Sequence, residues 1–151
     1  MKYFTQELLD MMDKENSSEY KEAYSKWMSN LKKYWSIFES FKGLLPNDLV
    51  KLFSHSFHDA HIRNIIFQQS GYSYDIVLTM DSDSFCGELV HKGVSEYSTA
   101  ISGVKNCGKI GDYRYGEILK QKAGWTHNFI FFNNSEILIK CEKLYWNTLD
   151  N

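Results

Sequence analysis

The sequence has little of what marks the specialised classes of protein. Of its 151 residues one is proline and three are cysteine, and 17 Lys and Arg nearly balance 19 Asp and Glu. This near-neutral chain lacks the basic surface that binds a phosphate backbone, so nucleic acid is not an expected partner. Lys2, Glu7 and Asp10 interrupt the apolar residues of the first segment, which therefore resembles neither a signal peptide nor a membrane span. We expect a soluble, cytoplasmic protein that does not bind membranes.

The cysteines exclude a second group of architectures. Cys86, Cys107 and Cys141 are odd in number and far apart, without the C-x-x-C spacing of a zinc site. Free thiols in a reducing compartment are therefore expected. At this length a single domain of residues 1–151 can bury a core that needs neither disulfides nor metal, and the 16% of aromatic residues should form much of it.

The first third of the chain predicts helices. Thr5 can cap a short helix over residues 6–13, and Asn16, followed by Glu19, can cap a second one. In the second helix the apolar residues recur every three or four positions, at Tyr20, Ala23, Tyr24, Trp27, Met28, Leu31, Tyr34, Trp35, Phe38 and Phe41.

This long helix, of about 24 residues, should span a small domain and pack its aromatic stripe into the core. Gly43 is expected to end it in a left-handed conformation, and Pro46 to begin a third helix over residues 46–54.

From His58 onward the apolar residues alternate as they do in strands. Strands are predicted from residue 58 to about 67, over 74–81, 85–94, 127–132 and 136–145, with a short one near 97–101 and an ambiguous element at 113–119. The turn at residues 133–135 contains two asparagines, which tolerate the positive φ of a tight turn. The order predicts an α+β fold in which N-terminal helices (1–57) pack on a C-terminal antiparallel sheet (58–151) of five or six strands.

Five short motifs are spread along the chain: Met-Lys-Tyr-Phe-Thr-x-Glu at residues 1–7, Leu45-Pro46 after the aromatic helix, His58-Asp59-Ala60 at the start of the sheet, Tyr115-x-Glu117-Ile118, and a last hairpin at 128–141. In this order they resemble a family of small bacterial proteins, of the Firmicutes type, whose function is unknown. The resemblance implies this order of elements. It brings no activity.

His55, His58, Asp59 and His61 are the only concentrated polar chemistry and invite a metal-site hypothesis. On a helix, neighbouring histidines three residues apart would share a face. On a strand, His58 and His61 would point to opposite faces and could not bind one ion, so the predicted strand counts against the site. The alternative is that His58 or Asp59 caps backbone groups between helix and sheet.

Other motifs are weak. Residues 81–84 resemble a calcium loop but lack its glycine and glutamate, and no nucleophile or phosphate-binding motif follows a strand. Tyr115 and Glu117 are candidates for contacting a ligand or partner. No cofactor is predicted.

Two functions are therefore weighed. The first, which the missing catalytic motifs favour, is a non-catalytic binding protein, of an immunity or regulatory kind, that receives another protein at an open face or edge of the sheet. The alternative is a metal-dependent hydrolase in which the cluster of His55, His58, Asp59 and His61 activates water.

Overall fold

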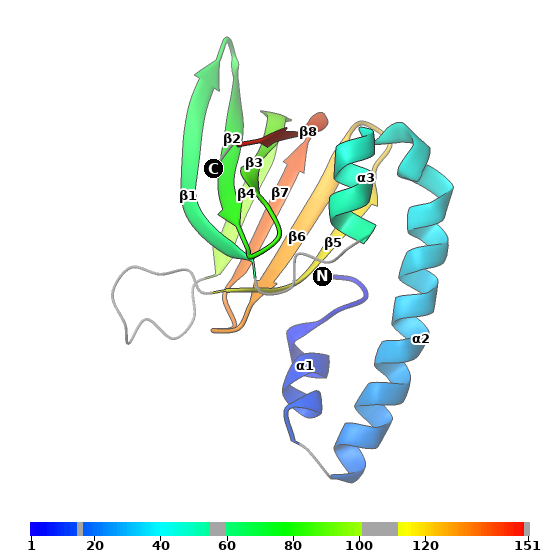
Figure 1. Ribbon diagram of the computed structural model, residues 1–151. Coiled ribbons are helices and arrows are strands. Elements are labelled where there is room, and N and C mark those ends of the chain that lie inside the picture. Colours follow the sequence, from blue (N-terminus) through cyan, green and yellow to red (C-terminus); the bar gives the residue numbers. More distant parts are fainter. Residues whose placement is uncertain (15–16, 55–59, 101–111, 150–151) are drawn as a thin grey trace.

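A computed structural model of the chain describes residues 1–14, 17–54, 60–100 and 112–149. The described residues form an α+β fold, as predicted, with helices first and antiparallel strands after them (Figure 1). The helices are α1 (Gln6–Met12), α2 (Ser18–Phe41) and α3 (Asn47–Ser54), with a short 3-10 turn, η1 (Lys42–Leu44), between the last two. The strands are β1 (His61–Ser70), β2 (Ser73–Asp81), β3 (Cys86–Val94), β4 (Glu96–Ala100), β5 (Tyr113–Lys120), β6 (Trp125–Phe131), β7 (Glu136–Cys141) and β8 (Lys143–Thr148).

The ends of the helices follow the sequence in part. Thr5 caps α1 as predicted, because its hydroxyl accepts a hydrogen bond from the amide of Leu8. The cap of α2 is Ser17, whose hydroxyl accepts from the amide of Tyr20 at 3.0 Å, whereas the predicted Asn16 lies outside the described residues. The prediction of a left-handed Gly43 is wrong, since Gly43 continues the helical path in η1.

Helix α2 has the predicted length of 24 residues, but its buried stripe is narrower than predicted. Its buried residues are Ala23, Trp27, Tyr34, Phe38 and Phe41. Tyr24 and Met28 are exposed and Trp35 is half-buried. Figure 1 shows that the start of α2 extends past the sheet with α1 beside it, which leaves part of the helix surface uncovered.

The strands form two four-stranded antiparallel sheets, in the orders β1-β2-β3-β8 and β4-β7-β6-β5, where the sequence predicted one sheet. The predicted strand over residues 136–145 divides at Glu142 into β7 and β8, which belong to different sheets. Strands β3 and β4 divide in the same way around Ser95. Gly93 has a φ of +64° at this corner, where its amide donates to Asp75 Oδ1 at 2.9 Å. Two stretches of chain, β3–β4 and β7–β8, thus bend from one sheet into the other and join the two sheets.

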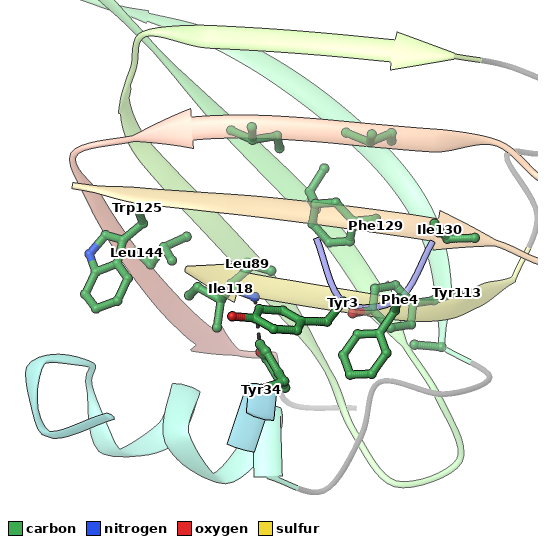
Figure 2. Packing of buried hydrophobic residues seen from close by; sticks show 14 of the residues in the cluster. Tyr3, Phe4, Tyr34, Leu89, Tyr113, Ile118, Trp125, Phe129, Ile130 and Leu144 are labelled. Carbon is green, nitrogen blue, oxygen red and sulfur yellow. Dashed lines mark hydrogen bonds between the residues drawn. The ribbon is translucent and has the colours of Figure 1, made fainter. Parts of the chain in front are cut away.

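The sheets also meet where β1 and β5 begin. The amide of Tyr113 donates to the carbonyl of Ala60 at 2.8 Å, and His61 pairs with Asp112 in a single antiparallel bridge. The core lies between the sheets and under the helices (Figure 2). Ring contacts of Phe41 with Trp125 and of Phe53 with His127 place α2 and α3 against β6. Among the described residues no helix has the length and apolarity needed to cross a membrane.

The packing of Trp27 generates the first prediction. Its ring is buried against Phe4 and Tyr115, with ring centroids 4.7 and 4.5 Å away. Trp27→Ala should lower the free energy of unfolding by about 3–5 kcal/mol, because it removes a large buried side chain and leaves a cavity. Urea unfolding measures this change, with the exposed neighbour Lys26→Ala as the control. Equal midpoints for the two variants would mean that the packing of α2 is misassigned.

Candidate functional site

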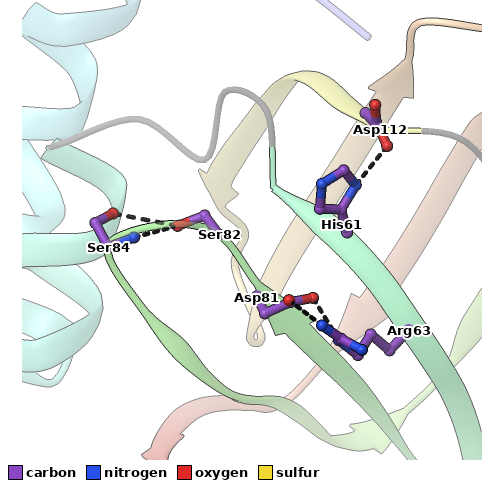
Figure 3. A network of polar contacts seen from close by, with 6 residues as sticks. All are labelled: His61, Arg63, Asp81, Ser82, Ser84 and Asp112. Carbon is purple, nitrogen blue, oxygen red and sulfur yellow. Dashed lines mark hydrogen bonds and ion pairs between the residues drawn. The ribbon is translucent and has the colours of Figure 1, made fainter.

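Of the predicted metal cluster the structure describes His61 alone. His55, His58 and Asp59 lie outside the described residues. His61 begins β1 with an exposed side chain, and its Nδ1 lies 2.5 Å from Asp112 Oδ1 (Figure 3). Within the described part of the chain no group of three His, Cys, Asp or Glu side chains is arranged to hold a metal. The metal-site hypothesis stays a prediction.

Arg63 makes a second polar contact on β1. Its Nε and Nη2 donate to the two carboxylate oxygens of Asp81 on β2, at 2.8 and 2.5 Å (Figure 3). These hydrogen bonds hold the pKa of Asp81 below its ordinary value. Both titratable side chains of β1, His61 and Arg63, therefore have acidic partners within the chain.

Glu117 has an internal role in the structure. It lies on β5, is fully buried, and its carboxylate accepts hydrogen bonds from three successive backbone amides, those of Lys2, Tyr3 and Phe4. The contacts to Lys2 and Phe4 measure 2.9 and 2.7 Å. Three amide donors satisfy a buried carboxylate that would otherwise be costly. Glu117 therefore anchors the N-terminal segment to the sheet.

Tyr115, the other predicted contact residue, lies half-buried on the same strand. Its ring packs edge-on against Trp27 and lines a hollow of about 130 Å³ together with Phe4, Leu31, Tyr34, Trp35, Phe53, Tyr113, Arg114 and Gly116. Arg114, the one charged residue of this lining, already pairs with Asp13 at 2.6 Å. The hollow can hold an apolar group. That Tyr115 and Glu117 contact a ligand or partner stays a prediction.

A pair of histidines that the sequence analysis did not single out joins the two sheets. His91 on β3 and His127 on β6 are fully buried, and Nε2 of His91 lies 3.1 Å from Nδ1 of His127. One nitrogen must donate and the other accept, so at least the accepting ring is neutral. Burial lowers the pKa of His91 to about 3, and burial followed by the proximity of His91 lowers that of His127 well below its ordinary value.

The histidine pair could have been found only in part from the sequence. Alternation along β3 puts His91 on the side of Leu89, and alternation along β6 puts His127 on the side of Phe129, so both could be placed inward. That they meet depends on how the two sheets face each other, which alternation does not determine. Phe53 of α3 and Phe129 pack on the His127 ring, which explains its exclusion from water.

The outer edge of β1 is the most exposed part of the sheets. Within the described residues β1 pairs with β2 on one side and, on the other, only through His61 with Asp112. Ile66 and Phe67 are 41% and 53% exposed, and Tyr74 on β2 is 55% exposed. Tyr72, in the turn between the two strands, is fully exposed. The hairpin thus carries apolar side chains beside backbone groups of β1 that pair with no further strand among the described residues.

The anchor at Glu117 generates the second prediction. Glu117→Ala should lower the free energy of unfolding by about 3–5 kcal/mol, since three backbone amides, two of them buried, lose their acceptor. Glu117→Gln should cost less, because its carbonyl oxygen still accepts. Urea midpoints and hydrogen exchange at residues 2–4 measure the two effects. Glu96→Ala, which breaks an exposed ion pair with Lys140, is the control and should cost under about 1 kcal/mol. An unchanged exchange rate at residues 2–4 in Glu117→Ala would contradict the anchoring role.

The histidine pair generates the third prediction. Because the folded state lowers the pKa of both rings, the unfolded chain binds more protons below its ordinary histidine pKa near 6.5. The stabilisation is therefore complete above pH 6.5 and is lost as the pH falls toward about 3, the folded pKa of His91. Each ring should contribute about 1.4 kcal/mol per pH unit to this loss.

Urea unfolding of the wild type and of His127→Gln between pH 7 and pH 5 tests the histidine prediction. The variant should show a shallower fall in the free energy of unfolding. Identical slopes for the wild type and His127→Gln would contradict the prediction.

Comparisons with known proteins provide no independent assignment. No protein-family model, no curated protein and no solved structure matches this chain significantly. The geometry of the described residues is therefore the basis for a functional proposal.

Proposed function

We propose that the chain is a non-catalytic interaction protein that binds an extended segment of another protein along the outer edge of β1, the edge that faces no other strand among the described residues. The observation that supports this proposal is the exposure of β1, a ten-residue edge strand with Ile66 and Phe67 accessible to solvent. Strand addition uses such an edge, because the incoming segment pairs with the unpaired amides and carbonyls while alternate side chains set specificity.

The composition of β1 supports the proposal. Exposed edges are usually protected by lysine, proline or a short length, since an unprotected edge pairs with other chains. The two charged or titratable residues of β1, His61 and Arg63, lie at its start and are engaged by Asp112 and Asp81. Residues 64–70 carry no charge and no proline. This half of the strand is therefore unprotected.

Aromatic residues beside the edge would add contact area. The ring of Phe67 packs edge-on against Tyr97 of β4, with centroids 5.0 Å apart, yet half of Phe67 stays exposed. Tyr72 and Tyr74 extend the exposed aromatic surface along the hairpin. Rigid aromatic side chains of this kind are enriched among residues that dominate binding energies.

The buried titratable groups support a non-catalytic role. Glu117 is occupied by backbone amides, and His91 and His127 face each other in the core. None of the three lies among the residues that line the 130 Å³ hollow. The hydrolase alternative depends on His55, His58 and Asp59 outside the described residues, together with His61.

A peptide selection tests the proposed binding site, and it is the fourth prediction. Displayed random peptides are selected on sparsely immobilised wild type, and their affinities are measured for Ile66→Asp/Phe67→Asp and for a control, Tyr24→Asp/Met28→Asp. The control changes residues of similar exposure, 46% and 37%, on α2. Apolar-alternating peptides should bind the wild type and the control equally and the β1 variant at least about tenfold more weakly. Equal binding to all three would contradict the proposal.

Elemental analysis separates the proposal from the hydrolase alternative. Stoichiometric zinc or nickel in untagged protein, lost in His55→Ala/His58→Ala/His61→Ala, would favour the alternative. The binding proposal expects no metal-dependent rise in melting temperature for either protein.

A further inference from the structure

We infer that the strand bound at this edge is the β1 strand of a second copy, paired antiparallel about a twofold axis at Ile66. The inference rests on the proposed function, because it identifies the partner of the same edge. In a twofold interface each contact occurs twice, so residue i of one copy meets residue j of the other and j meets i. A strand that pairs with its own copy must therefore have a symmetric order of polar and apolar residues.

Residues 64–68 have this symmetric order. The segment Asn-Ile-Ile-Phe-Gln carries a polar residue at each end and three apolar residues between them. With the axis at Ile66, Ile66 meets Ile66, Ile65 meets Phe67, and Asn64 meets Gln68. Every pair then matches apolar with apolar or polar with polar, as stabilising cross-strand pairs do.

The faces of the strand agree with this register. Ile65 and Phe67 pair across β1–β2 with Leu78 and Ile76, both fully buried, so these two side chains lie on the core side of the sheet. Asn64, Ile66 and Gln68 alternate to the other side. Residues directly opposite each other in an antiparallel pair share a face, and the register at Ile66 satisfies this for all five positions.

Neighbouring registers fit less well. An axis at Phe67 sets Ile66 against Gln68 and Ile65 against Gln69, while an axis at Ile65 sets Phe67 against Arg63. A shift of one residue in the pairing would put core-side residues opposite residues of the other face. Of these registers, only the one at Ile66 avoids such mismatches within residues 64–68.

Electrostatics also permits this pairing. Arg63 would meet the neutral Gln69 of the second copy, and Ile62 would meet Ser70, so no like charges lie directly opposite each other. Arg63 and His61 have their own acidic partners on β2 and at Asp112. An exposed edge without facing like charges lacks the usual barrier to self-association.

A charge-swap experiment tests the register. Asn64 and Gln68 are both exposed, so Asn64→Lys/Gln68→Lys and Asn64→Glu/Gln68→Glu should both leave the monomer folded. In the proposed dimer each variant sets like charges opposite each other twice, and an equimolar mixture sets Lys opposite Glu. Sedimentation velocity should show the wild type as a dimer and each variant with a dimer dissociation constant at least about tenfold higher. The equimolar mixture of the two variants should again be a dimer. Recovery on mixing excludes unfolding as the cause of dissociation.

Cysteine crosslinking tests the position of the axis. Ile66→Cys places two thiols opposite each other, within the distance that a disulfide spans, whereas Phe67→Cys places its thiol opposite Ile65. Mild oxidation should therefore crosslink Ile66→Cys at least about tenfold faster than Phe67→Cys. The wild type reports the background from native cysteines.

The outcomes separate this inference from the proposed function. The inference would be overturned if the wild type stayed monomeric at every accessible concentration. It would also be overturned if the wild type were a dimer whose dissociation and crosslinking did not change with the substitutions at residues 64–68. Peptides that still bind the β1 edge in that case would leave the proposed function intact. If the β1 variants bind the peptides and dimerise as the wild type does, both proposals fail.

Discussion

The carboxylate of Glu117 constrains the whole N-terminal half of the fold. A buried carboxylate needs hydrogen-bond donors, and here consecutive amides of residues 2–4 supply them. The N-terminal segment is thereby fixed on β5 before α1 begins. Phe4 is held where it packs against Trp27 and Tyr34 of α2, and Asn30 of α2 donates to the carbonyl of Tyr3 at 2.9 Å. The Glu117 carboxylate thus helps to fix where α1 and α2 lie on the sheet, together with the ring contact of Phe41 with Trp125.

The hydrogen bond between His91 and His127 constrains the position of the two sheets relative to each other. Apolar contacts alone allow two sheets to slide, because dispersion and burial have little directionality. A hydrogen bond between two fully buried rings is satisfied in only one relative position of β3 and β6. A further hydrogen bond aligns α2 with β5, because the hydroxyl of Tyr34 accepts the amide hydrogen of Ile118 at 3.1 Å (Figure 2). Polar contacts therefore select one arrangement of an otherwise adaptable core.

The sequence predicted what depends on local periodicity. The length of α2, the cap at Thr5, the positive φ of Asn134 in the last hairpin and the α+β order all follow from patterns a few residues long. The division into two sheets did not follow, because it depends on which strands pair, and the pairs of β3 with β8 and of β4 with β7 join residues far apart in the sequence. The Glu117 anchor and the histidine pair join residues 113 and 36 positions apart, which periodicity cannot connect. The exposure of β1 was beyond sequence reasoning for the same reason.

The edge strands of the two sheets differ in length and in charge, and this difference supports the proposed binding role of β1. β4 and β8 have five and six residues and carry Glu96 and Lys143, while the N-terminal segment is anchored to β5 through Glu117. β1 has ten residues, and from Asn64 to Ser70 it carries none of the usual protection. The irregularity between Ile62 and Asn64, with Arg63 turned to Asp81, disrupts only the start of the strand. An unprotected edge of this length invites aggregation unless a specific chain covers it. The start of β1 is protected, and the rest of the strand is regular and uncharged. A strand built in this way can pair with another chain over a limited length and in one register, and the protected start ends the pairing.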